Sequence, residues 1–231
     1  MQLEIEEDFV AMTVLCYLKS NTDKYLIHPS KQAQMFYSCI IVHSIVNALL
    51  FSMVYAILTN ENEDYSPNIA HNYAVFFVKF PCTLALHFVL YPEVANGMNM
   101  MKFTNNQPHL FVNNGSELGF LLGASQVFSG LLCEFICIYM LAYQHTVQHC
   151  IIHFVALEVI MEVGNLYFES LKSNYLKRVM HHPPVADHRG DTIVFKDRST
   201  FHKIARVYYK FLRSFYVGVI FYFVPFSVMF I

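Results

Sequence analysis

Long apolar stretches alternate with short polar ones along this chain. The apolar stretches cover residues 35–58, 72–91, 117–143, 147–168 and 214–231. A helix rises about 1.5 Å per residue, so about twenty residues are needed to cross a hydrocarbon core about 30 Å thick. The first four stretches reach that length, and the last is slightly shorter. The pattern therefore predicts an all-α integral membrane protein with about five transmembrane helices.

The polar stretches divide the chain into four parts. Residues 1–33 begin with an acidic run and continue with an apolar run, 9–18, that is too short to span a bilayer. This part is predicted to be an N-terminal surface segment, lying on the membrane or packed as an amphipathic helix. Residues 34–168 contain four spans. Residues 169–213 form a basic membrane-proximal loop that ends in an amphipathic helix, and residues 214–231 are the fifth span.

Two prolines mark the second span. Pro81 lies inside it and is expected to kink the helix, because its ring removes a backbone hydrogen bond. Pro92 follows the span and discourages continuation of the helix. The next stretch, residues 93–115, is rich in Asn, Gly and Met, and this composition is typical of connecting segments. We therefore expect a loop with a short surface helix there.

The composition agrees with a membrane protein. Hydrophobic residues make up 55% of the 231 residues and charged residues only 14%, whereas about 25% is usual for soluble domains. The net charge of -2 lacks the strong basic balance of nucleic-acid-binding proteins. Most of the six cysteines lie in apolar runs and none forms a Cys-x-x-Cys pair, so no disulfide framework is predicted.

Basic residues gather on one side of the predicted membrane. Three lysines precede the first span, one lies between the second and third spans, and ten of the fifteen Lys and Arg residues lie in the stretch 169–213. In a five-span protein these stretches share one side. The positive-inside rule then places the N-terminus on the cytoplasmic or matrix side and the C-terminus on the opposite side.

Several ionisable side chains lie within the predicted spans, where burial of charge is costly. Counted from the outer ends of their spans, Lys79 and Glu134 reach similar depths, about seven to nine residues in. They are predicted to form an ion pair that relieves two buried charges at once. His87 and Glu162 lie deeper and form a second predicted contact, with His43 at a comparable level. Such pairs serve either as structural clamps between helices or as parts of a proton or ion pathway.

The fourth span carries two polar stripes. At about 100° per residue, His145, His149 and His153 fall on one face of the helix. Glu158 and Glu162 fall on a largely opposite face, so a His-His-Glu metal site built from this helix alone is not predicted. The three histidines are candidates for zinc binding or pH sensing, or are packed polar aromatics near the headgroups. The glutamates are expected to face protein or water, because facing lipid would be too costly.

Small and polar residues line one face of the third span. Gly119 and Gly123 form a GxxxG motif, which permits close approach of two helix backbones. We expect this face to pack against other spans, with Glu134 buried in the contact. Its members are Gly119, Gly123, Gln126, Gly130, Cys133, Glu134 and Cys137.

A basic stripe precedes the last span. Its members recur at helical spacing, which suits contact with anionic lipid headgroups, and a solvated polar face is an equal alternative. The bilayer, including its anionic lipids, is therefore one predicted partner. The stripe consists of Lys203, Arg206, Lys210 and Arg213.

Three functions are compatible with this pattern. The first is a channel- or transporter-like protein, or a subunit of one, in which a carboxylate cluster of Glu134, Glu158 and Glu162 binds or passes cations or protons. The second is a structural, non-catalytic subunit of a larger membrane complex or a homo-oligomer. The third is a membrane-embedded metalloenzyme. The chain contains no catalytic motif that indicates a reaction, and no cofactor follows from its sequence.

Overall fold

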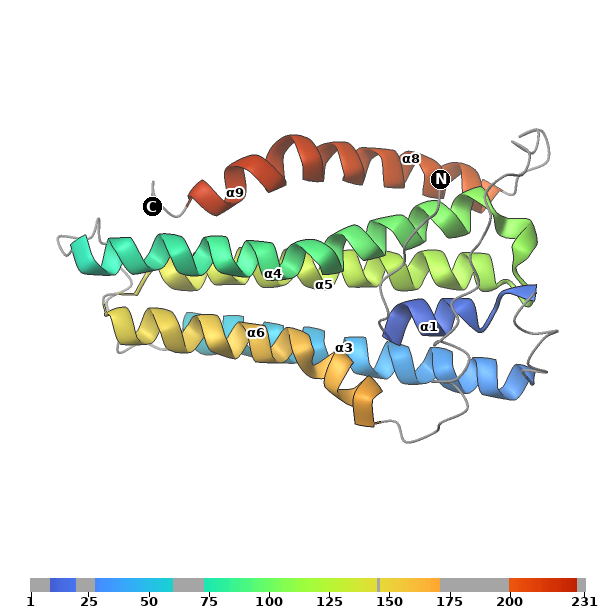
Figure 1. Ribbon diagram of the computed structural model, residues 1–231, viewed down its shortest axis with the longest axis horizontal. Helices are drawn as coiled ribbons and strands as arrows, with labels where there is room; N and C mark the ends of the chain where they lie inside the picture. Colours follow the sequence, from blue (N-terminus) through green and yellow to red (C-terminus); the bar gives the residue numbers. More distant parts are fainter. Residues whose placement is uncertain (1–8, 20–27, 60–72, 145, 171–199, 228–231) are drawn as a thin grey trace.

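The chain forms a bundle of long helices (Figure 1). The computed structural model describes residues 9–19, 28–59, 73–144, 146–170 and 200–227. Over these ranges the secondary structure consists of helices joined by short turns, with one isolated β-bridge between Leu18 and Phe111. The fold is thus all-α across the part of the chain that the structure describes.

Four helices are long and apolar enough to cross a membrane, within the described residues. They are α3 (Pro29–Thr59), α4 (Tyr73–Asn106), α5 (Gly115–Ala142) and α6 (Val147–Ser170). The remaining elements are α1 (Phe9–Leu15), the 3-10 turn η1 (Pro108–Leu110), α8 (Thr200–Phe215), the π-helical segment η3 (Tyr216–Ile220) and α9 (Phe221–Ser227).

The helices run along a common axis in two main layers (Figure 1). Helices α4 and α5 pack tightly against each other, and α3 and α6 lie together on one side of this pair. Helices α8 and α9 run along α4 on the opposite side. The short helix α1 packs against α3 and α5 at one end of the bundle. The layers therefore give α6 and α8 opposite outer sides of the molecule.

The predicted loop after Pro92 is wrong, because α4 continues through this proline to Asn106. Proline disrupts a helix only locally, and the following turns are held by packing against α5. Gly97 of α4 and Gly123 of α5 make the closest approach, since a Cβ on either would lie 2.8 Å from the carbonyl oxygen of the other. The small-residue face predicted for the third span is thereby confirmed as a helix contact, with Glu134 buried in it.

Helix α1 is packed inside the bundle end and does not lie on the surface. Its residues 9–14 are all buried. Two hydrogen bonds hold the turn that follows α1. Gln32 Nε2 donates to the Cys16 carbonyl at 2.9 Å, and the Val112 N–H donates to the Tyr17 carbonyl at 2.9 Å. An apolar run too short to span a bilayer is thus buried against longer helices, which removes its surface from water.

Burial also raises the pKa of the Cys16 thiol to about 12. Because the thiolate is the reactive form, its share at pH 8 should fall about a thousandfold relative to an ordinary thiol. We expect maleimide labelling of Cys16 at pH 8 to be slower by a similar factor, measured by mass spectrometry of its peptide. A Lys19→Cys variant supplies an exposed thiol nearby as the control. Equal labelling rates for the two thiols would contradict the buried position of α1.

The predicted fifth span, residues 214–231, is described as far as residue 227. This part is helical, with a π-helical segment at η3 that precedes α9. Together with α8, it runs beside α4 for much of the length of the bundle (Figure 1). Most of the predicted basic loop, residues 169–213, lies outside the described residues. A fifth crossing of the membrane therefore stays a prediction.

Candidate functional site

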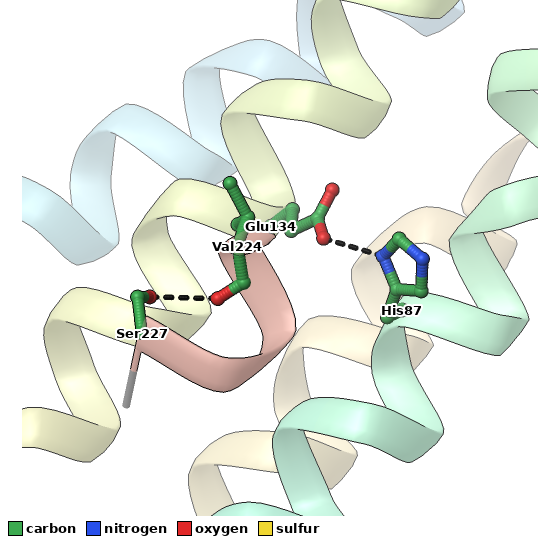
Figure 2. A network of polar contacts seen from close by, with 4 residues as sticks. All are labelled: His87, Glu134, Val224 and Ser227. Carbon is green, nitrogen blue, oxygen red and sulfur yellow. Dashed lines mark hydrogen bonds and ion pairs between the residues drawn. The ribbon is translucent and has the colours of Figure 1, made fainter. Parts of the chain in front are cut away.

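A buried acid–imidazole pair joins α4 to α5. His87 Nδ1 lies 2.6 Å from Glu134 Oε1, at hydrogen-bond distance, and the two side chains are 3% and 4% exposed. Figure 2 shows both side chains pointing toward each other from their helices, with Val224 and Ser227 of α9 alongside. A buried polar pair of this kind is stable only when its members satisfy each other.

Both predicted pairings within the membrane are wrong. Glu134 is bonded to His87 and not to Lys79, whereas Glu162 is exposed on α6 and bonded to Asn165. The Lys79 ammonium instead donates to the Ala142 carbonyl at 2.9 Å, at the last turn of α5. The start of α4 extends beyond the end of α5, so the residue level with Glu134 lies about two turns further along α4 than Lys79.

Aromatic side chains of η3 and α9 cover the His87–Glu134 pair. The Phe221 ring lies 5.2 Å from the His87 ring and 5.4 Å from the Tyr91 ring, between centroids. Tyr216 is also almost fully buried beside them. The outer nitrogen of the pair, His87 Nε2, has no hydrogen-bond partner among the described residues. The C-terminal helical segment therefore shields this pair from lipid.

A second polar site surrounds a cavity between α3, α4, α5 and α6. About 40 Å³ of it is open to the centres of water molecules, which is enough for about three waters. Its polar lining includes Glu93 and Gln126, whose side chains are joined by a 2.7 Å hydrogen bond from Gln126 Nε2 to Glu93 Oε2. The polar residues that line it are His43, Glu93, Gln126, Ser129 and Asn165.

His43 is the predicted site residue that reaches this cavity. Its Nε2 is buried and has no hydrogen-bond partner within the described ranges. Beside it, Ser129 Oγ donates to Asn47 Oδ1 at 3.1 Å. Phe9 and Val10 of α1 complete the lining at the end of the bundle where α1 lies. An imidazole nitrogen and a carboxylate thus line one cavity that has room for water.

The sequence reasoning missed Glu93, because this residue was assigned to a loop. One signal could have found it: Val94, Met98 and Met101 continue the apolar spacing of a helix past Pro92, and all three are buried. A helix through this region places Glu93 inside the bundle.

The carboxylates predicted to form one cluster do not come together. Glu134 faces α4, whereas Glu162 is exposed on the outer face of α6 and Glu158 is partly exposed there. The buried positions of α6 include Cys150 and Leu157, and Gly164 approaches α3. The side of α6 with Cys150, Leu157 and Gly164 therefore packs against the bundle, and the glutamates lie on the outer side of the helix.

The histidine stripe of α6 lies at the start of that helix, at the end of the bundle away from α1. His149 is exposed, and its ring centroid lies 6.4 Å from that of His153. His145 lies outside the described residues. Within the described part of the chain, no group of three or more His, Cys, Asp or Glu side chains could hold a metal ion. A metal site that includes His145 stays a prediction.

The basic stripe is found on the outer side of α8. Lys203, Lys210 and Arg213 are exposed, and Arg206 is half-buried. The opposite side of α8 packs on the α4–α5 pair, where His202 and Ala205 are buried. The helical spacing of the stripe is confirmed, and its contact with anionic headgroups stays a prediction.

Comparison of the chain with models of protein families, with curated proteins and with solved structures finds no match. The four long apolar helices are compatible with a multi-pass α-helical membrane protein. Any more specific function has to be argued from the two polar sites inside the bundle and from its outer surface.

Proposed function

We propose that this protein is channel- or transporter-like and that protons or small cations enter the cavity beside Glu93. The observation that carries the proposal is a carboxylate on a water-sized cavity in the core of a membrane bundle. Ionisable groups at membrane depth are costly and typically mark ion or proton pathways. Glu93 supplies the charge that attracts a cation into the cavity.

The polar groups follow one another along α4. Lys79, His87 and Glu93 are spaced along this helix by about two turns each. His87 forms the buried pair with Glu134, and Glu93 contacts Gln126, so α5 supplies a partner at both inner positions. A series of such groups along a helix is the arrangement that a proton relay requires. In this proposal a proton or cation passes the His87–Glu134 pair and the Glu93 cavity one after the other.

The proposed topology has five crossings and an N-terminus on the cytoplasmic or matrix side. Support for the fifth crossing comes from the position of α8, η3 and α9 along α4 (Figure 1). In this arrangement the end of the bundle that holds α1 faces the cytoplasm or matrix. Phe9 and Val10 then close the inner end of the cavity, and movement of α1 would open it.

Glu93→Gln is expected to lower proton or cation flux by about tenfold or more, because the amide keeps the shape of the side chain but removes its charge. The full-length protein would be reconstituted in liposomes that contain a pH-sensitive dye, and flux would be followed after a membrane potential is imposed. A parallel assay would use a potassium- or sodium-sensitive dye.

The matched control is Glu158→Gln, which removes a carboxylate from the outer face of α6 and should leave flux unchanged. Protein-free liposomes give the background rate. The proposal fails if the wild-type protein conducts no faster than this background, or if Glu93→Gln conducts as well as the wild type.

A structural subunit of a larger membrane complex is the second candidate. It is favoured by α3 and α6, whose apolar windows are only 22% and 11% buried in the chain by itself. Such weakly covered helices are typical of surfaces that pack against neighbouring membrane proteins. The third alternative, a membrane-embedded metalloenzyme, has no observation in its favour within the described residues.

A further inference from the structure

The outer face of α6 presents carboxylates in the middle of an apolar surface. Glu162 is exposed and Glu158 is partly exposed, and both lie inside the apolar window of this helix. Ile151, Val155 and Leu166 are exposed on the same face. Glu162 accepts a 3.0 Å hydrogen bond from Asn165 Nδ2, which satisfies only part of its carboxylate. Lipid tails cannot solvate the remainder, so this face requires a polar partner.

The outer face of α8 carries the complementary charge. Lys210 and Arg213 are exposed there, next to the exposed apolar side chains Val207 and Phe211. The outer face of α8 therefore has cationic side chains on an apolar surface. The outer face of α6 has carboxylates on an apolar surface. Helices α8 and α6 lie on opposite outer sides of the bundle (Figure 1). A direct contact between the two faces within one chain is thus excluded by the layers that separate them.

The two charged faces lie at similar depths. Glu162 lies level with Glu93, because its neighbours Met161 and Asn165 line the same cavity as Glu93. Phe221 contacts Tyr91, and α8 runs in the direction opposite to α4. Arg213 lies eight residues before Phe221, so it falls within about two helical turns of the level of Glu93, and so of Glu162.

We propose that copies of this chain assemble side by side in the membrane, with α6 of one copy packed against α8 of the next. Copies in one membrane share their orientation, so two faces can meet only if they lie at similar depths. Glu158 and Glu162 of one copy then face Arg213 and Lys210 of its neighbour. Because the two faces are different, the contact is heterologous, and its repetition adds copies one after another.

Anionic lipid is the competing ligand for the basic face, but it leaves the other face unexplained. A headgroup can neutralise Lys210 and Arg213, whereas it repels Glu158 and Glu162. A second copy satisfies both faces by one contact. The assembly does not depend on the cavity beside Glu93, so transport and assembly are separate properties of the chain.

Charge reversal tests the contact. One variant carries Glu158→Lys and Glu162→Lys, and another carries Lys210→Glu and Arg213→Glu. Each alone places like charges at every contact and is expected to weaken self-association by about tenfold or more. An equimolar mixture of the two restores opposite charges at both contacts, so it should assemble as the wild type does, in strict alternation. Native mass spectrometry of the full chain in nanodiscs or mild detergent measures the oligomeric states.

A cross-linking experiment provides a second measurement that does not depend on charge reversal. Leu166 and Phe211 are 56% and 67% exposed and lie at matching levels on the two faces. A chain with both Leu166→Cys and Phe211→Cys is expected to give a ladder of dimers, trimers and larger species with a short bis-maleimide. Chains with only one of these cysteines should give no ladder.

Lys19→Glu is the control for charge reversal away from both faces, and it should assemble normally. Circular dichroism confirms that each variant keeps its helices. A monomeric wild type without a ladder overturns the proposal, as does a mixture that fails to restore assembly. The proposal is also overturned if Glu162 variants assemble as the wild type does. In that case the basic face would serve only to bind anionic lipid such as phosphatidylserine.

Discussion

Replacement of His87 by leucine is expected to lower the free energy of unfolding by about 3–5 kcal/mol. The substitution leaves the Glu134 carboxyl buried without the partner that lies 2.6 Å away in the native protein. The Phe221 ring packs against the His87 ring and offers no hydrogen-bonding group that could replace the lost bond. Equilibrium unfolding in mixed micelles with increasing sodium dodecyl sulfate, followed by circular dichroism, measures the change.

The double variant His87→Leu/Glu134→Leu distinguishes a polar pair from a simple packing effect. Removal of both partners leaves no unsatisfied group, so most of the lost stability should return. His149→Leu is the control, because this histidine is exposed on α6, and its effect should stay within about 0.5 kcal/mol. If the two single substitutions simply added in the double variant, His87 and Glu134 would not act as a pair.

Gly97→Ala is expected to destabilise the protein by about 1–3 kcal/mol. The new Cβ would lie 2.8 Å from the Gly123 carbonyl oxygen and 2.8 Å from Val127 Cγ2. A backbone oxygen in the adjacent helix cannot move without displacing that helix, so α4 and α5 have to separate. Gly123→Ala meets the Gly97 carbonyl oxygen at the same distance and should have an effect of similar size. The detergent unfolding assay described for His87 measures both.

Two glycines in less crowded positions serve as controls for this effect. A Cβ on Gly164 would meet its nearest neighbour, Val42 Cγ1, at 3.8 Å, and a Cβ on Gly218 would meet nothing within 4 Å. Alanine at either position should be neutral or stabilise by up to about 1 kcal/mol, since it reduces the freedom of the unfolded chain. Equal losses at Gly97 and Gly164 would show that backbone approach is not what holds α4 to α5.

Both predictions concern the α4–α5 pair because this pair carries the polar sites. His87 and Glu93 lie on α4, and their partners Glu134 and Gln126 lie on α5. The close approach at Gly97 and Gly123 sets the spacing of the two helices between these contacts. Variants that separate the helices should therefore also disturb the cavity, and their flux can be compared with that of Glu93→Gln.

The sequence by itself determined the class of the protein and the character of individual helices. Apolar runs of sufficient length specify spans without reference to their neighbours, because the contrast between lipid and water acts on each segment separately. Four of the five predicted spans correspond to apolar helices in the structure. The small-residue face of α5 was also visible, since a GxxxG motif and its neighbours lie on one side of a single helix.

The tertiary structure decided which polar residues meet. Depth counted from the end of a predicted span assumed that neighbouring helices begin level with one another, and the longer α4 breaks this assumption. For this reason Glu134 pairs with His87, and Lys79 reaches the Ala142 carbonyl. Glu93 entered the bundle only because packing on α5 extends α4 past Pro92. Whether a stripe faces inward or outward likewise depends on the competing faces of one helix, and on α6 the side with Cys150, Leu157 and Gly164 packs against the bundle.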